Sequence, residues 1–183
     1  MRPDAPGTDP SGLVTDHASD LIADSTATFS ACRTYRYALT RTWSDARLPL
    51  AFVMLNPSTA DAFTVDPTIR RCLGFARRWG AGGLLVLNAY GLRSIDPKVL
   101  RGHPDPIGPS NDAVIAERLA APAARVVVAW GAHAEPDRAR HVAELICAAG
   151  HRPACLGRTK TGAPRHPLYV ASATLAEEWT SAA

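Results

Sequence analysis

Three short apolar runs, separated by segments of helical periodicity, constrain the fold of this chain most. Residues 51–55, 82–88 and 125–131 are rich in branched apolar residues and are short enough to be buried strands. Strands that alternate with helices predict a parallel sheet with helices on both faces. The helices expected between and after these runs span residues 68–79, 111–119 and 135–149.

The remaining segments complete the predicted organisation. Residues 1–27 are rich in Asp, Ser, Thr, Pro and Gly, which predicts a flexible N-terminal arm. Residues 28–183 are expected to form a single α/β domain. In this domain, the alternation of apolar and polar residues over 29–43 indicates one or two antiparallel edge strands. A further short strand is predicted over residues 152–156. A last helix is predicted over residues 173–179.

Composition excludes several classes of protein. The chain has 183 residues, of which 46% are hydrophobic and 20% charged, as is typical of a globular domain. The net charge of +3 permits a polyanionic partner without requiring one. No apolar run approaches the roughly 20 residues that span a bilayer. The four cysteines form no C-x-x-C pair. We therefore expect a cytoplasmic monomer without a signal peptide, membrane partner, metal or cofactor.

Polar residues follow the predicted strands or lie in the final loop. Asn56-Pro57 comes directly after the first apolar run, Asn88 closes the second, and His166-Pro167 lies near the end of the chain. Open α/β sheets bind ligands at the carboxyl ends of their strands. Asn56, Asn88 and His166 are therefore expected to share one rim.

Four segments resemble the uracil-DNA glycosylases in order and approximate spacing. They are Leu55-Asn56-Pro57, residues 83–89, residues 127–134 and His166-Pro167-Leu168, within residues 52–170. The chain is also similar to an uncharacterised family, domain of unknown function 1643. Three segments carry that second resemblance: residues 56–61 (NPSTAD), 66–71 (DPTIRR) and 165–169 (RHPLY).

The glycosylase resemblance implies a three-layer α/β/α fold with a mostly parallel central sheet. It also implies removal of a deaminated or otherwise abnormal base from DNA by a hydrolase that needs no metal. In that interpretation Asn56 positions the attacking water, His166 stabilises the leaving base and Asn88 reads the base edge. Ser58 stands where the glycosylases have a tyrosine, so the base pocket should be roomier, and Phe63 is the candidate stacking residue.

Base flipping requires a wedge to fill the gap in the duplex and cations to hold the backbone. Leu168 and Tyr169 follow His166-Pro167 and are the candidate wedges. The expected nucleic-acid-binding cations are Arg158, Lys160, Arg165, Arg70 and Arg71.

Simpler interpretations stay open for several of these residues. The Asn88 side chain can fix the following loop by hydrogen bonds to the backbone of that loop, and His166 can be a structural histidine. His133 is expected to cap its own helix. Arg70, Arg71, Arg77 and Arg78 share a helix face that is either solvated or binds phosphate. Two alternative functions remain as well: an enzyme of the same fold that acts on a free or modified nucleotide, and a non-catalytic nucleic-acid-binding protein.

Overall fold

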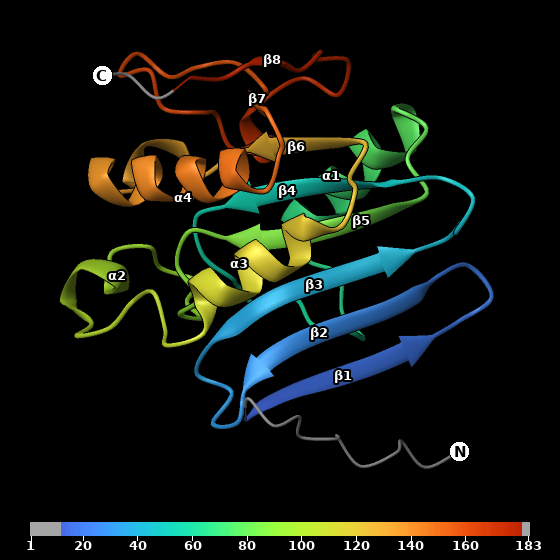
Figure 1. Ribbon diagram of the computed structural model, residues 1–183, viewed down its shortest axis with the longest axis horizontal. Coiled ribbons are helices and arrows are strands. Elements are labelled where there is room, and N and C mark those ends of the chain that lie inside the picture. Colours follow the sequence, from blue (N-terminus) through green and yellow to red (C-terminus); the bar gives the residue numbers. More distant parts are fainter. Residues whose placement is uncertain (1–11, 181–183) are drawn as a thin grey trace.

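A computed structural model describes residues 12–180 as one mixed α/β unit (Figure 1). Within these residues one sheet has the strand order β1-β2-β3-β5-β4-β6-β7-β8. The strands are β1 (Leu13–Ser19), β2 (Asp24–Ser30), β3 (Arg36–Thr42), β4 (Pro49–Met54), β5 (Gly83–Asn88), β6 (Arg125–Val128), β7 (Pro153–Cys155) and β8 (Glu177–Glu178). The helices are α1 (Pro67–Arg78), α2 (Val99–Gly102), α3 (Asn111–Ala120) and α4 (Pro136–Ala148), with short 3-10 turns η1 (Gly131–His133) and η2 (Pro167–Tyr169).

The prediction of a mostly parallel sheet is wrong for the sheet as a whole. The middle strands β5, β4, β6 and β7 are parallel to one another, as the three apolar runs predicted. The pairs β1–β2, β2–β3, β3–β5 and β7–β8 are antiparallel and outnumber them within residues 12–180. The short connections between β1, β2 and β3 allow only antiparallel pairing, since a parallel crossover needs a dozen or more residues.

The predicted arm over residues 1–27 does not hold for residues 13–27. This part of the chain supplies β1 and the first half of β2. Threonine pairs across the strands take the place of the apolar alternation that would have indicated them: the hydroxyls of Thr26 and Thr40 lie 2.6 Å apart. Residues 1–11 lie outside the described residues.

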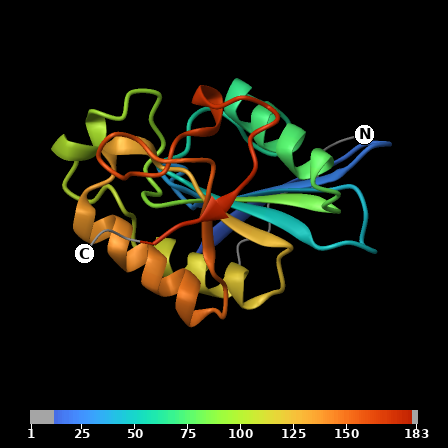
Figure 2. The same cartoon turned by 90° about the horizontal axis from the view of Figure 1, so that it is seen from above.

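Helices cover both faces of the parallel strands (Figure 2). In β4, Leu50, Phe52 and Met54 face the core under α1, whereas Ala51 and Val53 face the core under α3 and α4. This alternation explains why the run appeared continuously apolar in the sequence: a strand that is buried on both faces has no polar side. The helical residues in these two cores are Ile69, Cys72, Phe75 and Ala76 from α1, Val114, Ile115 and Leu119 from α3, and Val142 and Ile146 from α4.

Helix α1 begins as predicted, with Asp66 as its N-cap. The Asp66 carboxylate accepts a hydrogen bond of 2.7 Å from the backbone N–H of Ile69, and Pro67 occupies the first turn. The predicted helix over residues 173–179 is wrong. Instead β8 pairs with β7, and Trp179 is buried with its ring 5.2 Å from that of Trp130 in an edge-to-face arrangement. Burial of two indole rings outweighs the weak helical preference of so short a segment.

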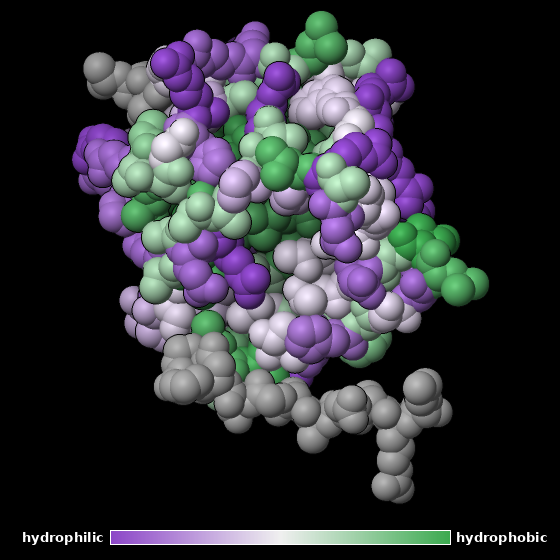
Figure 3. Space-filling view, turned by 45° about the vertical axis from the view of Figure 1, so that its right-hand side comes forward, coloured by the Kyte–Doolittle hydropathy of each residue, from purple (hydrophilic) through white to green (hydrophobic). Residues whose placement is uncertain are grey.

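The surface is mixed in character. The face seen in Figure 3 is covered largely by hydrophilic side chains, with apolar groups exposed in separate places between them. No helix within residues 12–180 is both long enough and apolar enough to cross a membrane.

Candidate functional site

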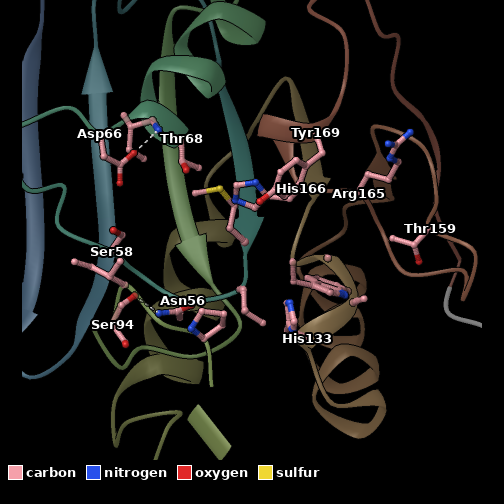
Figure 4. A pocket seen from close by; sticks show the side chains of 18 of the residues that line it. Asn56, Ser58, Asp66, Thr68, Ser94, His133, Thr159, Arg165, His166 and Tyr169 are labelled. Atoms are coloured by element: carbon pink, nitrogen blue, oxygen red, sulfur yellow. Dashed lines mark hydrogen bonds between the residues drawn. The ribbon is translucent and has the colours of Figure 1, made fainter. Parts of the chain in front are cut away.

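A cavity of about 530 Å³ lies at the carboxyl ends of the parallel strands. Its walls come from the ends of β4 and β6, the N-terminus of α1, the loop after β5, η1 and the segment that leads into η2. Figure 4 shows the labelled side chains surrounding it, with Asp66 and Thr68 on one side and His133 and His166 on the other. The structure thus places Asn56 and His166 in the same cavity, as expected for a shared rim.

The Asn56 side chain is held by its amide nitrogen. Nδ2 donates to the backbone oxygens of Ser94 at 2.9 Å, Pro57 at 3.2 Å and Leu92 at 3.4 Å. The other amide atom, Oδ1, accepts no hydrogen bond from residues 12–180. The amide is therefore fixed in orientation, and its oxygen is available to accept a hydrogen bond from a water molecule or a ligand.

His166 is half-buried and its two ring nitrogens have different roles. Nδ1 accepts a hydrogen bond of 3.4 Å from the backbone N–H of Leu168. Burial lowers the pKa of His166 below its ordinary value of 6.5, and the charge of Asp66 opposes this only in part. At neutral pH the ring is therefore uncharged and carries its proton on Nε2. His166 therefore has a structural role through Nδ1, which accepts from Leu168, while its Nε2–H remains available to donate to a ligand.

Arg71 is a positioning residue for the segment that carries His166. Its Nε donates to the backbone oxygen of Pro167 at 3.3 Å, and Nη2 donates to that of Val170. These bonds attach η2 to α1. Arg71 is therefore neither a freely solvated residue nor a free phosphate ligand.

Replacement of Arg71 by methionine should loosen η2 while leaving the sheet intact. Hydrogen–deuterium exchange at residues 168–170 is expected to rise, with a loss of about 1.5–3 kcal/mol in unfolding free energy, the usual value of hydrogen bonds to charged groups. Arg70→Met is the matched control, because Arg70 is exposed on the next position of the same helix. Equal exchange at residues 168–170 in the two variants would contradict the positioning role.

Asn88 does not line the cavity. Its side chain is completely buried beside Met54, which does line it, and neither of its amide atoms has a hydrogen-bond partner within residues 12–180. The alternative interpretation, in which this side chain fixes the following loop, is not what the structure shows either. The backbone oxygen of Asn88 instead accepts a hydrogen bond of 3.0 Å from Nδ2 of Asn111.

Two other predicted site residues lie away from the cavity. Phe63 is 63% exposed and lines a separate groove near the turn between β1 and β2. Arg158 donates to the backbone oxygens of Glu178 and Thr180, so it fastens the C-terminal strand. Lys160 is exposed and lines neither the cavity nor a groove described here.

The other predicted residues surround the cavity or a groove next to it. Ser58, Arg165 and Tyr169 line the cavity itself. Arg70, Arg71 and Leu168 line a neighbouring groove of about 340 Å³ on the outer side of α1. The two hollows are separated by η2, with His166 in one and Leu168 in the other. The remaining residues of the groove are Pro67, Gly74, Phe75, Arg78 and Ser172.

Several cavity residues escaped the sequence analysis. Arg36 was not predicted as a site residue; it belongs to the alternating segment 29–43, is 1% exposed and lines the cavity. His133 was expected to cap a helix, but it makes no capping hydrogen bond and lies on the cavity wall. Asp66 and Thr68 belong to the DPTIRR segment, which was the available signal for them. No group of three or more His, Cys, Asp or Glu side chains suited to a metal occurs in the described part of the chain.

One comparison identifies the family. The model of the family described as "Protein of unknown function (DUF1643)" matches residues 36–168. The chain belongs to this family. The DUF1643 region begins at Arg36 and includes Asn56, Asp66 and His166, so nearly the whole cavity lies within it. No curated protein and no solved structure matches the chain.

Proposed function

We propose that this DUF1643 protein is an N-glycosidic hydrolase that removes a deaminated or otherwise abnormal base from DNA. The observation that carries the proposal is the pairing, in one cavity, of a neutral histidine that keeps a free N–H with an asparagine whose amide is fixed. The cavity of about 530 Å³ is in the range of small-ligand sites, which supports entry of a flipped base.

The proposed reaction separates charge between base and sugar. The bond between C1′ and the base nitrogen breaks with its electron pair on the base, while the sugar becomes cationic. The Nε2–H of His166 donates to a base oxygen on which negative charge develops, and it is already oriented before the reaction. Water then bonds to C1′ and releases a proton to solvent, and the base gains a proton from solvent.

Asn56 positions the water in this proposal. Its Oδ1 accepts a hydrogen bond from the water, while the bonds from Nδ2 to the loop after β5 hold the amide in place. A neutral amide cannot remove a proton, so this role suits a dissociative path in which the sugar cation forms before water attacks. Ser58, also on the cavity wall, leaves room that a larger side chain would fill.

We further propose that the fold is of the uracil-DNA glycosylase type. Helices on both faces of the parallel strands and a cavity at the carboxyl ends of those strands support this. The N-terminal hairpin of β1 and β2 then extends the sheet at its antiparallel edge.

The groove outside α1 supports a polynucleotide rather than a free nucleoside or nucleotide as the substrate. Arg70 and Arg78 are both exposed there, with no carboxylate in ion-pair distance among residues 12–180. Between this groove and the cavity stand Leu168, 43% exposed, and Tyr169, 73% exposed. We propose that the groove holds the DNA backbone while one of these two side chains fills the gap left by the flipped base, with Arg165 at the cavity rim.

Replacement of Arg70 and Arg78 by glutamine should weaken DNA binding and also change its salt dependence. Two lost phosphate contacts are expected to reduce the slope of log K against log salt by about 1.8 on duplex DNA. Fluorescence anisotropy with a labelled oligonucleotide at several salt concentrations measures this slope. The control is Arg101→Gln with Arg140→Gln, two exposed arginines outside the groove. If the slope of log K against log salt is the same in the two double variants, the groove is not a DNA-binding surface.

A second candidate function is hydrolysis of a free or modified nucleoside or nucleotide, and Asp66 favours it. One oxygen of this carboxylate caps α1, and the side chain also faces the cavity. A carboxylate accepts hydrogen bonds from sugar hydroxyls, and ribose offers more of these than deoxyribose does.

A cleavage screen tests the proposed function. Labelled single- and double-stranded oligonucleotides, each with one uracil, hypoxanthine, xanthine or alkylated base, are incubated with the protein and then with alkali. Strand breaks that disappear in Asn56→Ala are expected. Release of base from free nucleosides alone would support the second candidate, and DNA binding without release from either substrate would indicate a non-catalytic binding protein.

A further inference from the structure

The floor of the cavity is apolar except for one buried cation. The lining residues with the least exposure are Arg36 at 1%, Ile69 at 1%, Trp130 at 2%, Met54 at 4% and Leu55 at 8%. The rim, in contrast, is built from exposed polar residues such as His133 and Arg165. A flat heterocycle that enters such a floor has apolar side chains and the Arg36 guanidinium among its neighbours.

The Arg36 guanidinium is incompletely satisfied. Its Nη1 donates to the backbone oxygen of Ala60, but Nε has no hydrogen-bond partner in the described residues. No carboxylate of residues 12–180 forms an ion pair with it. Burial lowers the pKa of Arg36 to about 10, with the charge of Asp66 acting in the opposite direction, so the group remains a cation at neutral pH. A buried cation that lacks an ionic partner is costly, which makes a ligand acceptor favourable here.

We propose that Arg36 determines the substrate class by selecting bases that present oxygen at their edge over bases that present an amine. This inference rests on the proposed function, because it assumes that a base enters the cavity. A guanidinium has only donors. It therefore pairs with the O6 and N7 acceptors of a 6-oxopurine, the pattern that arginine reads in guanine, whereas the N6 amine of adenine opposes it with another donor.

Deamination is the chemical change that this selection detects. Conversion of adenine to hypoxanthine, or of cytosine to uracil, replaces an exocyclic donor by an acceptor. The donor-only Arg36 thus favours hypoxanthine over adenine and uracil over cytosine. Its positive charge also suits the negative charge that a departing oxo base acquires. A phosphate is a poorer occupant of this floor, because Met54 and Ile69 have no donor and the indole of Trp130 has only one, fewer than a phosphate needs.

Equilibrium binding of free bases tests the inference without requiring turnover. Isothermal titration calorimetry of the whole chain with hypoxanthine and adenine, and with uracil and cytosine, compares oxo with amino bases. The wild-type protein should bind the oxo base tenfold or more tightly, and Arg36→Met should lose this preference. Arg36→Lys keeps the charge without the planar fork, so it should retain a smaller preference and remains informative if the methionine variant does not fold.

Arg41→Met is the matched control. Arg41 is another buried arginine of β3 and likewise donates to backbone oxygens of the segment after β4, at 2.5 Å from that of Asp61, but it lies outside the cavity. It should keep the wild-type preference. Equal affinity of the wild-type protein for oxo and amino bases would overturn the inference, as would a preference that survives in Arg36→Met. Arg36-dependent binding of inorganic phosphate without discrimination between bases would also overturn it.

The result separates this inference from the proposed function. A preference for oxo bases without cleavage of any oligonucleotide would support the role of Arg36 and contradict the proposed glycosylase activity. Cleavage that is equally fast for all bases, and unaffected by Arg36→Met, would support the glycosylase activity and contradict the role of Arg36.

Discussion

The variant His166→Ala should cleave a damaged oligonucleotide about 10²–10³ times more slowly than the wild-type protein, the usual cost of removing one oriented donor to a developing negative charge. Stability should change little in comparison, because the ring contributes one long hydrogen bond from the backbone of Leu168. Single-turnover cleavage rates measure the effect. The control is His141→Ala, an exposed histidine on α4 that pairs with Asp112 outside the cavity. Equal loss in both variants would remove His166 from the mechanism.

The pH dependence of the same reaction follows from the lowered pKa of His166. The neutral ring is the form in which Nδ1 accepts from Leu168 and Nε2 donates, so the rate should be constant near neutrality. It should fall when the pH drops through the pKa of the folded state, which lies below the ordinary 6.5. The unfolded chain takes up this proton first, so folding stability is also lost as the pH falls below 6.5 toward the folded pKa. An acid limb with a midpoint above 6.5 would contradict this assignment.

The variant Phe52→Ala should lower the free energy of unfolding by about 3–5 kcal/mol, as for large aromatic side chains in other cores. Phe52 is fully buried in β4, and its ring centroid lies 6.3 Å from that of Phe75 on α1. The same packing holds the helix whose N-cap, Asp66, forms part of the cavity wall. Urea denaturation measures the loss.

Phe63→Ala is the matched control for this prediction. Phe63 is 63% exposed, and surface substitutions usually change stability by less than about 0.5 kcal/mol. Cleavage should also be unaffected by Phe63→Ala, because this ring lies in a groove separate from the cavity. Similar losses of stability in the two variants would contradict the packing described for β4 and α1.

The central strands and helices could be predicted because their signals are local. The run 51–55 is apolar on both faces, and Asp66-Pro67 marks the start of α1 within two residues. The N-terminal strands lacked such a signal, because Thr15 pairs with Thr28 and Thr26 with Thr40 where apolar residues would have shown a period of two. At the C-terminus, β8 depends on the contact of Trp179 with Trp130, which is distant in sequence and invisible to a local pattern.

Part of the candidate site could also be predicted from the sequence. Asn56 and His166 were found because each precedes a proline at a point where the local pattern ends. Arg36 could not be found, because nothing in the sequence indicates the burial of a cation. Asn88 was placed correctly at the end of its strand, but its side chain faces the core beside Met54 rather than the cavity.

The most direct test of the account is the detection of free base by mass spectrometry. Oligonucleotides that contain a single hypoxanthine or uracil are incubated with the wild-type protein, with Asn56→Ala and with His166→Ala, and the released small molecules are identified. The account predicts free hypoxanthine or uracil from the wild-type protein and a strongly reduced amount from both variants. The absence of free base from folded wild-type protein that binds these oligonucleotides, or equal release by all three proteins, would contradict it.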